Sequence, residues 1–123
     1  MKIIIDTHIF LWALADPARI SSGKLRELEN PANIIFVSSI TVTEIMIKAS
    51  IGKLQFDYNP LELAQQSGFE SLEYTVQDAL LLKDMPFHHK DPFDRMLICQ
   101  SLNNAYPLMT DDSKIKRYNC RVI

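Results

Sequence analysis

Three consecutive isoleucines, Ile3 to Ile5, stand near the start of the chain and are followed directly by Asp6. A continuous run of β-branched residues is typical of a strand that is buried on both faces, as in the centre of a parallel sheet. A second apolar run, Asn-Ile-Ile-Phe-Val-Ser, covers residues 33–38. We therefore expect two buried strands of a mostly parallel sheet.

Helical segments alternate with these strands along the chain. Residues typical of helix ends mark them, such as the pair Thr41 and Glu44 as a capping box and Gly52 after a helix. The expected helices cover residues 8–15, about 21–29, 41–51, 60–67, 75–82 and 91–104, with further short strands at 71–74, 107–110 and 121–123. This alternation predicts a single α/β domain, residues 1–123, with helices on both faces of the sheet.

Acidic residues come directly after the predicted strands or open the helices that follow them. Asp6 follows the first strand, Glu44 comes about one helical turn after the second, and Asp112 follows the strand at 107–110. Asp91 and Asp94 open the helix that starts at residue 91. Ligands of such sheets bind beyond the carboxyl ends of the strands, so we expect these acids at one edge of the sheet.

Each acid, taken alone, has a structural explanation. Asp91 suits the N-cap of a helix with Pro92 at its first position, and Asp94 at the third position is favoured by the helix dipole. Glu44 completes a capping box with Thr41. Acids at helix starts are common, so none of them establishes a functional site by itself.

Taken together, the acids require a further explanation. Carboxylates gathered at one edge repel one another, and the positive ends of helices offset only part of that repulsion. Either some of them are protonated or a cation lies between them. Oxygen ligands without a matched Cys or His set favour Mg²⁺ or Mn²⁺ over zinc. A carboxylate-bound divalent ion activates water and stabilises charge on a phosphoryl oxygen, which is the chemistry of metal-dependent nucleases.

The overall composition argues against several other classes of protein. The chain has 123 residues, a formal net charge of -2 and only three glycines, so neither a glycine-rich phosphate loop nor general electrostatic attraction to nucleic acid is expected. Cys99 and Cys120 lack the spacing of a zinc site or a disulfide framework. The first apolar run is interrupted by Asp6 and His8, so we expect a cytoplasmic protein without a signal peptide or membrane span.

Four stretches, in order, span essentially the whole chain and carry a resemblance to a known family. They are Ile3-Ile4-Ile5-Asp6-Thr7-His8, Ser38-Ser39 followed by Glu44, Asp91-Pro92-Phe93-Asp94-Arg95 with Ile98, and Leu108-Met109-Thr110-Asp111-Asp112. With these motifs the chain resembles PIN-domain ribonucleases, and among them VapC-type toxins of type II toxin–antitoxin pairs. No motif is decisive alone, but four at suitable spacing are fairly specific. The resemblance implies a PIN-like three-layer α/β/α domain.

The resemblance assigns roles residue by residue. Asp6, Glu44 and Asp94 match the three acids that define the metal site of the family. Asp112 matches the fourth, because the family pattern after the strand is Thr, any residue, Asp. Residues of second rank are Asp91, mainly as a helix cap and secondarily for a second metal, Asp111 at the variable place, and Thr7 and Thr110 for hydroxyl contacts near the metal. Arg95 or Lys114 is a candidate for steering the RNA backbone or stabilising the developing charge, with surface solvation as the favoured alternative for each.

The activity that the resemblance implies is a Mg²⁺- or Mn²⁺-dependent ribonuclease that cleaves RNA phosphodiesters with metal-activated water. It also implies a cognate antitoxin as partner and a homodimer. Two alternatives remain open: a catalytically silent PIN-like interaction module and an acidic-pocket, Mg²⁺-binding regulatory domain. The second fits less well, because Glu44 and Asp94 are expected in helices rather than at strand ends. A nuclease with a housekeeping role in RNA processing is also compatible with the sequence.

His88 and His89 are not expected to belong to the site. They are adjacent in a loop, and neighbouring histidines point in different directions more often than they share a metal. Ser38, Ser39 and Ser113 lack a His–Asp arrangement suited to nucleophilic catalysis. The acids are therefore the only strong candidates for chemistry.

Overall fold

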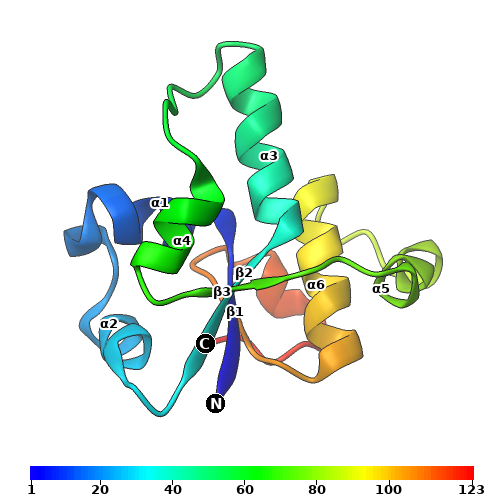
Figure 1. Cartoon of the computed structure of the whole chain (residues 1–123). Coiled ribbons are helices and arrows are strands. Elements are labelled where there is room, and N and C mark those ends of the chain that lie inside the picture. Colours follow the sequence, from blue (N-terminus) through cyan, green and yellow to red (C-terminus); the bar gives the residue numbers. More distant parts are fainter.

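The structure, a computed structural model that describes residues 1–123, is a sheet with helices on both sides (Figure 1). The strands are β1 (Lys2–Ile5), β2 (Ile34–Ser38), β3 (Glu70–Leu72) and β4 (Leu108–Met109). Their order is β3-β2-β1-β4 and every pairing is parallel. The predicted three-layer α/β/α architecture with a mostly parallel sheet is confirmed.

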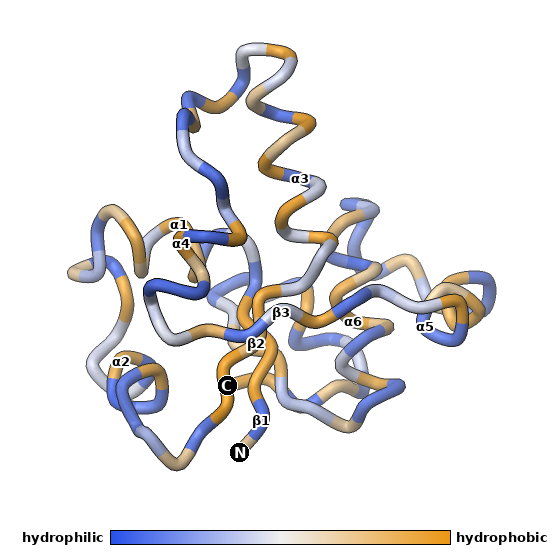
Figure 2. The backbone as a smooth tube through the Cα atoms, viewed as in Figure 1, coloured by the Kyte–Doolittle hydropathy of each residue, from blue (hydrophilic) through white to orange (hydrophobic).

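The inner strand β1 is buried on both faces, as its three isoleucines predicted. Ile4 packs into the core on one side of the sheet, while Ile3 and Ile5 pack into the core on the other side. All three are fully buried. Figure 2 shows β1 and β2 as a continuous hydrophobic stretch at the centre of the molecule. The sheet therefore provides a rigid base, and the residues at its carboxyl edge are held by this core.

The helices form the two outer layers. Their bounds are α1 (Thr7–Ala15), α2 (Ser22–Glu29), α3 (Ser39–Ser50), α4 (Pro60–Gln66), α5 (Val76–Leu80) and α6 (Pro92–Asn104). α1, α2 and α4 cover the face of Ile3 and Ile5, and α6 covers the face of Ile4. α3 contributes to both cores, through Ile40 on the side of α6 and Ile45 on the side of α1.

Helix α3 begins directly at the end of β2, so the predicted start at Thr41 is wrong. Ser38 is the N-cap, and its hydroxyl accepts a hydrogen bond from the N–H of Ile40 at 3.0 Å. Thr41 is buried within the first turn, 3.1 Å from the hydroxyl of Thr7, and makes no capping box with Glu44. Because the chain turns from strand to helix without a loop, the last strand residue performs the capping. Glu44 is thus free of any capping role.

The residue that takes the left-handed conformation after a helix was predicted correctly for α3 but not for α6. Gly52 takes the positive φ of 74° that was expected of it, and the N–H of Lys53 reaches back to the carbonyl of Lys48 at 2.9 Å. In α6 the left-handed residue is Ala105, with φ 56°, rather than Asn103 or Asn104. The predicted end of the helix near Asn103-Asn104 is confirmed, since α6 runs to Asn104, but the left-handed residue is the one that follows.

The edges of the sheet are shorter than predicted. The segment at 121–123 makes a single parallel bridge from Val122 to Leu108 instead of a full strand.

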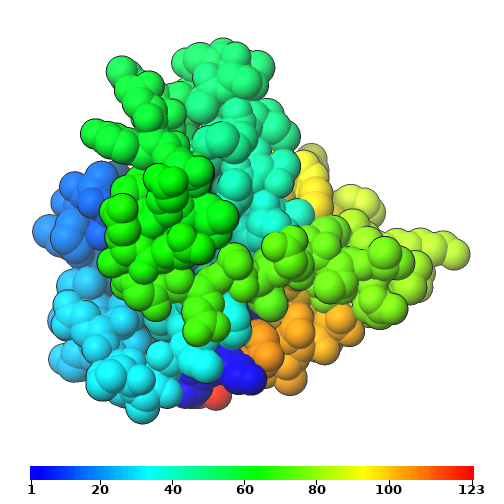
Figure 3. Space-filling model, viewed as in Figure 1, coloured from blue at the N-terminus to red at the C-terminus, as the bar shows by residue number.

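No helix of the structure is long and apolar enough to cross a membrane. The tip of α3 and the loop after it stand out from the body of the molecule (Figure 3). Met46, Ile47 and Ile51 are exposed on that projecting end.

Candidate metal centre

Asp6 lies at the carboxyl end of β1 and is the N-cap of α1. One of its oxygens accepts a hydrogen bond from the N–H of Ile9 at 2.8 Å, and the other accepts from the hydroxyl of Thr110. The side chain is almost fully buried. Burial raises the pKa of Asp6, while these two hydrogen bonds act in the opposite direction. Asp6 is therefore a buried acid that tolerates its charge only because of local donors.

Glu44 enters the same region from α3 and is also buried. Its Oε1 accepts a hydrogen bond from the hydroxyl of Thr7 at 2.7 Å, and its Oε2 pairs with the ammonium of Lys48 at 2.6 Å. The hydrogen bond to Glu44 raises the pKa of Lys48, and the charges of Asp91 and Asp94 add to this increase. Lys48 is thus a counter-ion of the site supplied by the chain itself.

Asp91 and Asp94 open α6 in the way the sequence predicted. Asp91 is the N-cap, and its Oδ1 accepts hydrogen bonds from the N–H groups of Phe93 at 2.8 Å and Asp94 at 3.2 Å. The side chain of Asp94 is only 15% exposed. Burial, followed by the charge of Asp91, raises the pKa of Asp94 to about 7; Asp6 and Glu44 act in the same direction. Asp94 therefore faces the other acids across the site.

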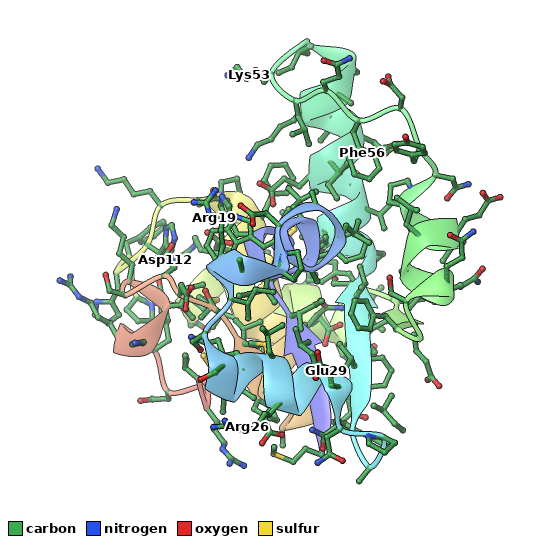
Figure 4. All side chains as sticks on the ribbon, turned by 90° about the vertical axis from the view of Figure 1, so that its left-hand side faces the viewer. Arg19, Arg26, Glu29, Lys53, Phe56 and Asp112 are labelled. Atoms are coloured by element: carbon green, nitrogen blue, oxygen red, sulfur yellow. The ribbon has the colours of Figure 1, made fainter.

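Asp112 and Asp111 leave the end of β4 in different directions. Asp112 Oδ1 accepts the N–H of Lys114 at 2.9 Å, and its Oδ2 lies 2.8 Å from Nε2 of His89. Burial acts to raise the pKa of Asp112, but these hydrogen bonds outweigh it and the pKa is lowered. Asp111 pairs instead with Lys24 on α2. Figure 4 labels Asp112 on the segment that follows β4.

Two threonines connect these acids. Thr7 follows Asp6 in the chain and donates its hydroxyl to Glu44. Thr110 donates its hydroxyl to Asp6 and accepts the backbone N–H of Asp112 at 3.0 Å. The hydroxyls of both threonines therefore lie among the acids, as expected. Together they place acids from α1, α3 and the end of β4 in one hydrogen-bonded arrangement.

Asp94 differs from the other three acids of the site. Each oxygen of Asp6, Glu44 and Asp112 has a donor from the protein. Asp94 has only a 3.0 Å contact of its Oδ2 with His89, and its Oδ1 has no hydrogen-bond partner. A largely buried carboxylate with so few donors favours taking up a proton or binding a cation. The raised pKa of Asp94 is the consequence of this situation.

His89 is the site residue that sequence reasoning missed. The two adjacent histidines do point in different directions, as expected, since His88 packs edge-on against Tyr118 while His89 is buried in the site. Excluding both was nevertheless wrong for His89, whose Nε2 contacts Asp112 and Asp94. Its position just before the helix cap Asp91 was the available signal, but the loop conformation that turns it inward has no sequence signature.

Arg95 does not face the opening of the site. Its guanidinium is buried and donates to the carbonyls of Pro86 at 2.9 Å and His89 at 3.3 Å. It also donates to the hydroxyl of Tyr118 at 3.2 Å and lies over the ring of Phe87, 4.0 Å from its centre. The expected role of Arg95 in steering RNA is therefore replaced by a structural one, which is to hold the loop that carries His89.

The residues present fit a hard divalent cation. The carboxylate oxygens of Asp94 and its neighbours are the ligands that Mg²⁺ and Mn²⁺ prefer, and Oδ1 of Asp94 has no donor from the protein. Asp94 and Asp112 lie close enough to share an ion, and His89 lies beside them, with one ligand-type atom of each of the three residues within 4.8 Å of the others. A hollow of about 530 Å³ between η2 (Leu81–Asp84), α6 and Tyr118 is lined by none of these residues.

Comparison with protein-family models matches residues 3–119 to the PIN domain. The chain belongs to the PIN-domain family. PIN domains are generally divalent-metal-dependent nucleases, and the acidic centre at the sheet edge agrees with that chemistry. A comparison with curated protein sequences gave no match.

Solved structures share this PIN fold over nearly the whole chain. VapBC2 from Rickettsia felis, bound to a DNA fragment from its promoter, is 17% identical with a TM-score of 0.74, covering 100% of this chain and 98% of that one. DNA-bound VapBC from Salmonella typhimurium is 18% identical with a TM-score of 0.67, covering 100% and 97%. The PIN domain endonuclease Utp24 is 19% identical with a TM-score of 0.53, covering 94% and 74%. Identities this low show the fold alone.

The pKa of Asp94 predicts how the stability of the metal-free PIN domain depends on pH. With a pKa of about 7 in the folded state and about 3.9 in the unfolded state, Asp94 binds more protons when folded, so its contribution to stability is lost as pH rises from 4 to 7. In EDTA at pH 8, the free energy of unfolding of Asp94→Asn, measured with urea, should therefore be roughly 1–3 kcal/mol higher than that of the wild type.

The order should reverse when Mg²⁺ is added, because only the wild type gains stability from binding the ion. At pH 4 the two proteins should be almost equally stable. Asp57→Asn, a change at an exposed loop position, serves as control and should match the wild type in both buffers. A metal-free Asp94→Asn protein that is less stable than the wild type at pH 8 would contradict this account of the site.

Proposed function

We propose that this PIN domain is a metal-dependent ribonuclease and acts as the toxin of a toxin–antitoxin pair. The observation that carries the nuclease is Asp94, a half-buried acid with a pKa of about 7 that lies near Asp91, Asp6 and Glu44 and has no protein donor on Oδ1. Such an arrangement is costly in the absence of a cation. A divalent ion bound among these acids would offset their mutual repulsion.

Four acids would hold the ion, namely Asp6, Glu44, Asp94 and Asp112. When bound there, Mg²⁺ or Mn²⁺ supplies a water of lowered pKa and stabilises negative charge on a phosphate oxygen. Thr7 and Thr110 orient Glu44 and Asp6 through their hydroxyls. Because these acids are fixed before RNA arrives, little reorganisation is needed when the scissile phosphate is positioned.

Basic side chains around the acids suit an RNA backbone. The ammonium of Lys48 lies against Glu44 and is 40% exposed, so it can also reach a bound phosphate. Lys90 and Lys114 are exposed beside the acids Asp91 and Asp112 in the chain. Lysines placed in this way neutralise phosphates without reading bases, which would bring an otherwise acidic chain onto RNA.

The toxin role rests on the fold and on exposed apolar surface. The VapBC structures with the same fold are toxin–antitoxin complexes by their names, which supports an antitoxin as partner. Met46, Ile47 and Ile51, together on the projecting end of α3, offer a surface that a second copy of the chain or the antitoxin would cover. A homodimer that binds an antitoxin is therefore part of the proposal.

Two other readings are less well supported. A regulatory Mg²⁺-binding domain requires its acids at strand ends, whereas Glu44 lies within α3 and Asp94 within α6. A catalytically silent interaction module has no need of a buried acid left without a donor, because replacing Asp94 by a neutral residue would stabilise it. A housekeeping nuclease shares the chemistry and differs only in its RNA and in the absence of an antitoxin.

The purified protein should cleave RNA in Mg²⁺ or Mn²⁺ and stop when EDTA is added. Asp94→Asn and Asp6→Asn should each lower the rate by roughly 100-fold or more, because they remove charged ligands of the ion. Cleavage is measured on total RNA and on single-stranded DNA, with Asp57→Asn as a control that retains full activity. Undiminished cleavage by Asp94→Asn, or cleavage that persists in EDTA, would refute the proposed chemistry.

Expression of the wild-type chain in bacteria should arrest growth, and expression of Asp94→Asn should not, because arrest depends on RNA cleavage. A small open reading frame directly upstream of the gene is expected to encode the antitoxin, and its co-expression should restore growth and give a complex that co-purifies with the chain. RNA from the arrested cells is mapped for new 5′ ends. Normal growth despite active enzyme in the lysate would count against the toxin role and leave the ribonuclease in place.

A further inference from the structure

His89 is held in the site by hydrogen bonds at three of its groups. Its backbone N–H donates to the hydroxyl of Tyr118 at 3.0 Å, and its side chain is buried. Nδ1 accepts the backbone N–H of Asp91 at 3.2 Å. Nε2 lies 2.8 Å from Oδ2 of Asp112 and 3.0 Å from Oδ2 of Asp94. The backbone contact and the contacts at both ring nitrogens together fix the direction of the imidazole.

The contact with Asp91 determines which nitrogen of His89 carries the proton. A backbone N–H only donates, so Nδ1 must be the unprotonated nitrogen that accepts it. In the neutral ring Nε2 then bears the hydrogen and donates it to Oδ2 of Asp112, while Oδ2 of Asp94 lies 3.0 Å from the same nitrogen. A nitrogen that carries a hydrogen has no lone pair for a metal. The close grouping of His89 with Asp94 and Asp112 is therefore a hydrogen-bonded group rather than a mixed nitrogen–oxygen metal site.

The loop that carries His89 is fixed from behind. Tyr118 donates its hydroxyl to the carbonyl of Pro86 at 2.7 Å while accepting from His89 and from Arg95. Arg95 in turn donates to the carbonyls of Pro86 and His89. This buried guanidinium has no carboxylate partner, and its Nη1 makes all three of these contacts with the loop and with Tyr118. The loop is thereby held with its imidazole toward the acids.

We propose that His89 is a positioning residue of the nuclease: its Nε2–H donates to Oδ2 of Asp112 and stands 3.0 Å from Oδ2 of Asp94, which lessens the repulsion between the two carboxylates and leaves Oδ1 of Asp94 free for the cation. This inference rests on the proposed function, since it gives the acids a metal to bind. His89 raises the affinity for the ion without touching it. The arrangement is comparable to the hydrogen bonds that orient ligands from behind in metal sites, where their loss weakens binding.

The test compares two substitutions that separate donation from ligation. His89→Ala removes the donor, and His89→Gln places an amide N–H close to the position of Nε2. Binding of Mg²⁺ and of Mn²⁺ is measured by calorimetry for each purified full-length protein, and folding is checked by circular dichroism. His88→Ala, the exposed neighbour, is the matched control and should bind both ions as the wild type does.

His89→Ala should weaken the binding of Mg²⁺ and of Mn²⁺ by a similar factor of roughly 10–100, and His89→Gln should remain within roughly threefold of the wild type. If His89 were a ligand instead, both substitutions would weaken Mn²⁺ much more than Mg²⁺, because imidazole suits transition metals. That result, or wild-type affinity in His89→Ala, overturns the inference. If His89→Ala fails to fold, the behaviour of His89→Gln decides the question by itself.

Nitrogen-15 spectra of the imidazole provide a second readout that a purely structural role would not produce. His89 should show a protonated Nε2 and an unprotonated Nδ1, both in EDTA and in saturating Mg²⁺. A protonated Nδ1 with a metal-shifted Nε2 would overturn the inference. Metal binding that follows this pattern without any RNA cleavage would refute the proposed ribonuclease and leave the role of His89 intact, so the two failures are distinguishable.

Discussion

Mutual repulsion of carboxylates at one edge of the sheet is the constraint on which the rest of the site depends. The protein offsets this repulsion with different hydrogen-bond donors or cations at each acid. Asp6 takes the amino end of α1 and the hydroxyl of Thr110, and Glu44 takes the ammonium of Lys48. Asp112 takes a backbone N–H and His89. Asp94 has only the 3.0 Å contact of its Oδ2 with His89, so the remaining repulsion is concentrated on this one carboxylate.

The fold explains how the protein tolerates the repulsion among these carboxylates. Ile3 to Ile5 anchor β1 between two cores, and Asp6 is attached directly to that strand. Glu44 is held on α3, whose first turn continues β2 without a loop. Burial of the apolar sheet offsets the cost of the crowded acids, and a divalent ion would remove that cost on binding. Binding of a metal ion would therefore stabilise the protein. In a protein that binds no metal, the crowded acids would only be destabilising.

The sequence revealed the parts of the site that depend on local rules. The order of strands and helices, the cap at Asp91 and the approach of Glu44 and Asp94 to the carboxyl edge follow from apolar runs and the geometry of α/β sheets. The capping box at Thr41 failed because the helix starts at the strand end. His89 could not be found, since its inward direction depends on Arg95 and on Tyr118, which is distant in the chain and meets it only after folding.

The carboxyl carbon of Asp94 provides the most direct measurement of the central claim, because its ¹³C chemical shift reports protonation of this one group. In EDTA the shift should titrate with a pKa of about 7. In saturating Mg²⁺ the carboxyl should stay ionised to well below that pH, because the ion replaces the proton. Titration near the ordinary value for an aspartate in EDTA, with no change on adding Mg²⁺, would contradict the account of Asp94 as the acid that the protein leaves for a cation.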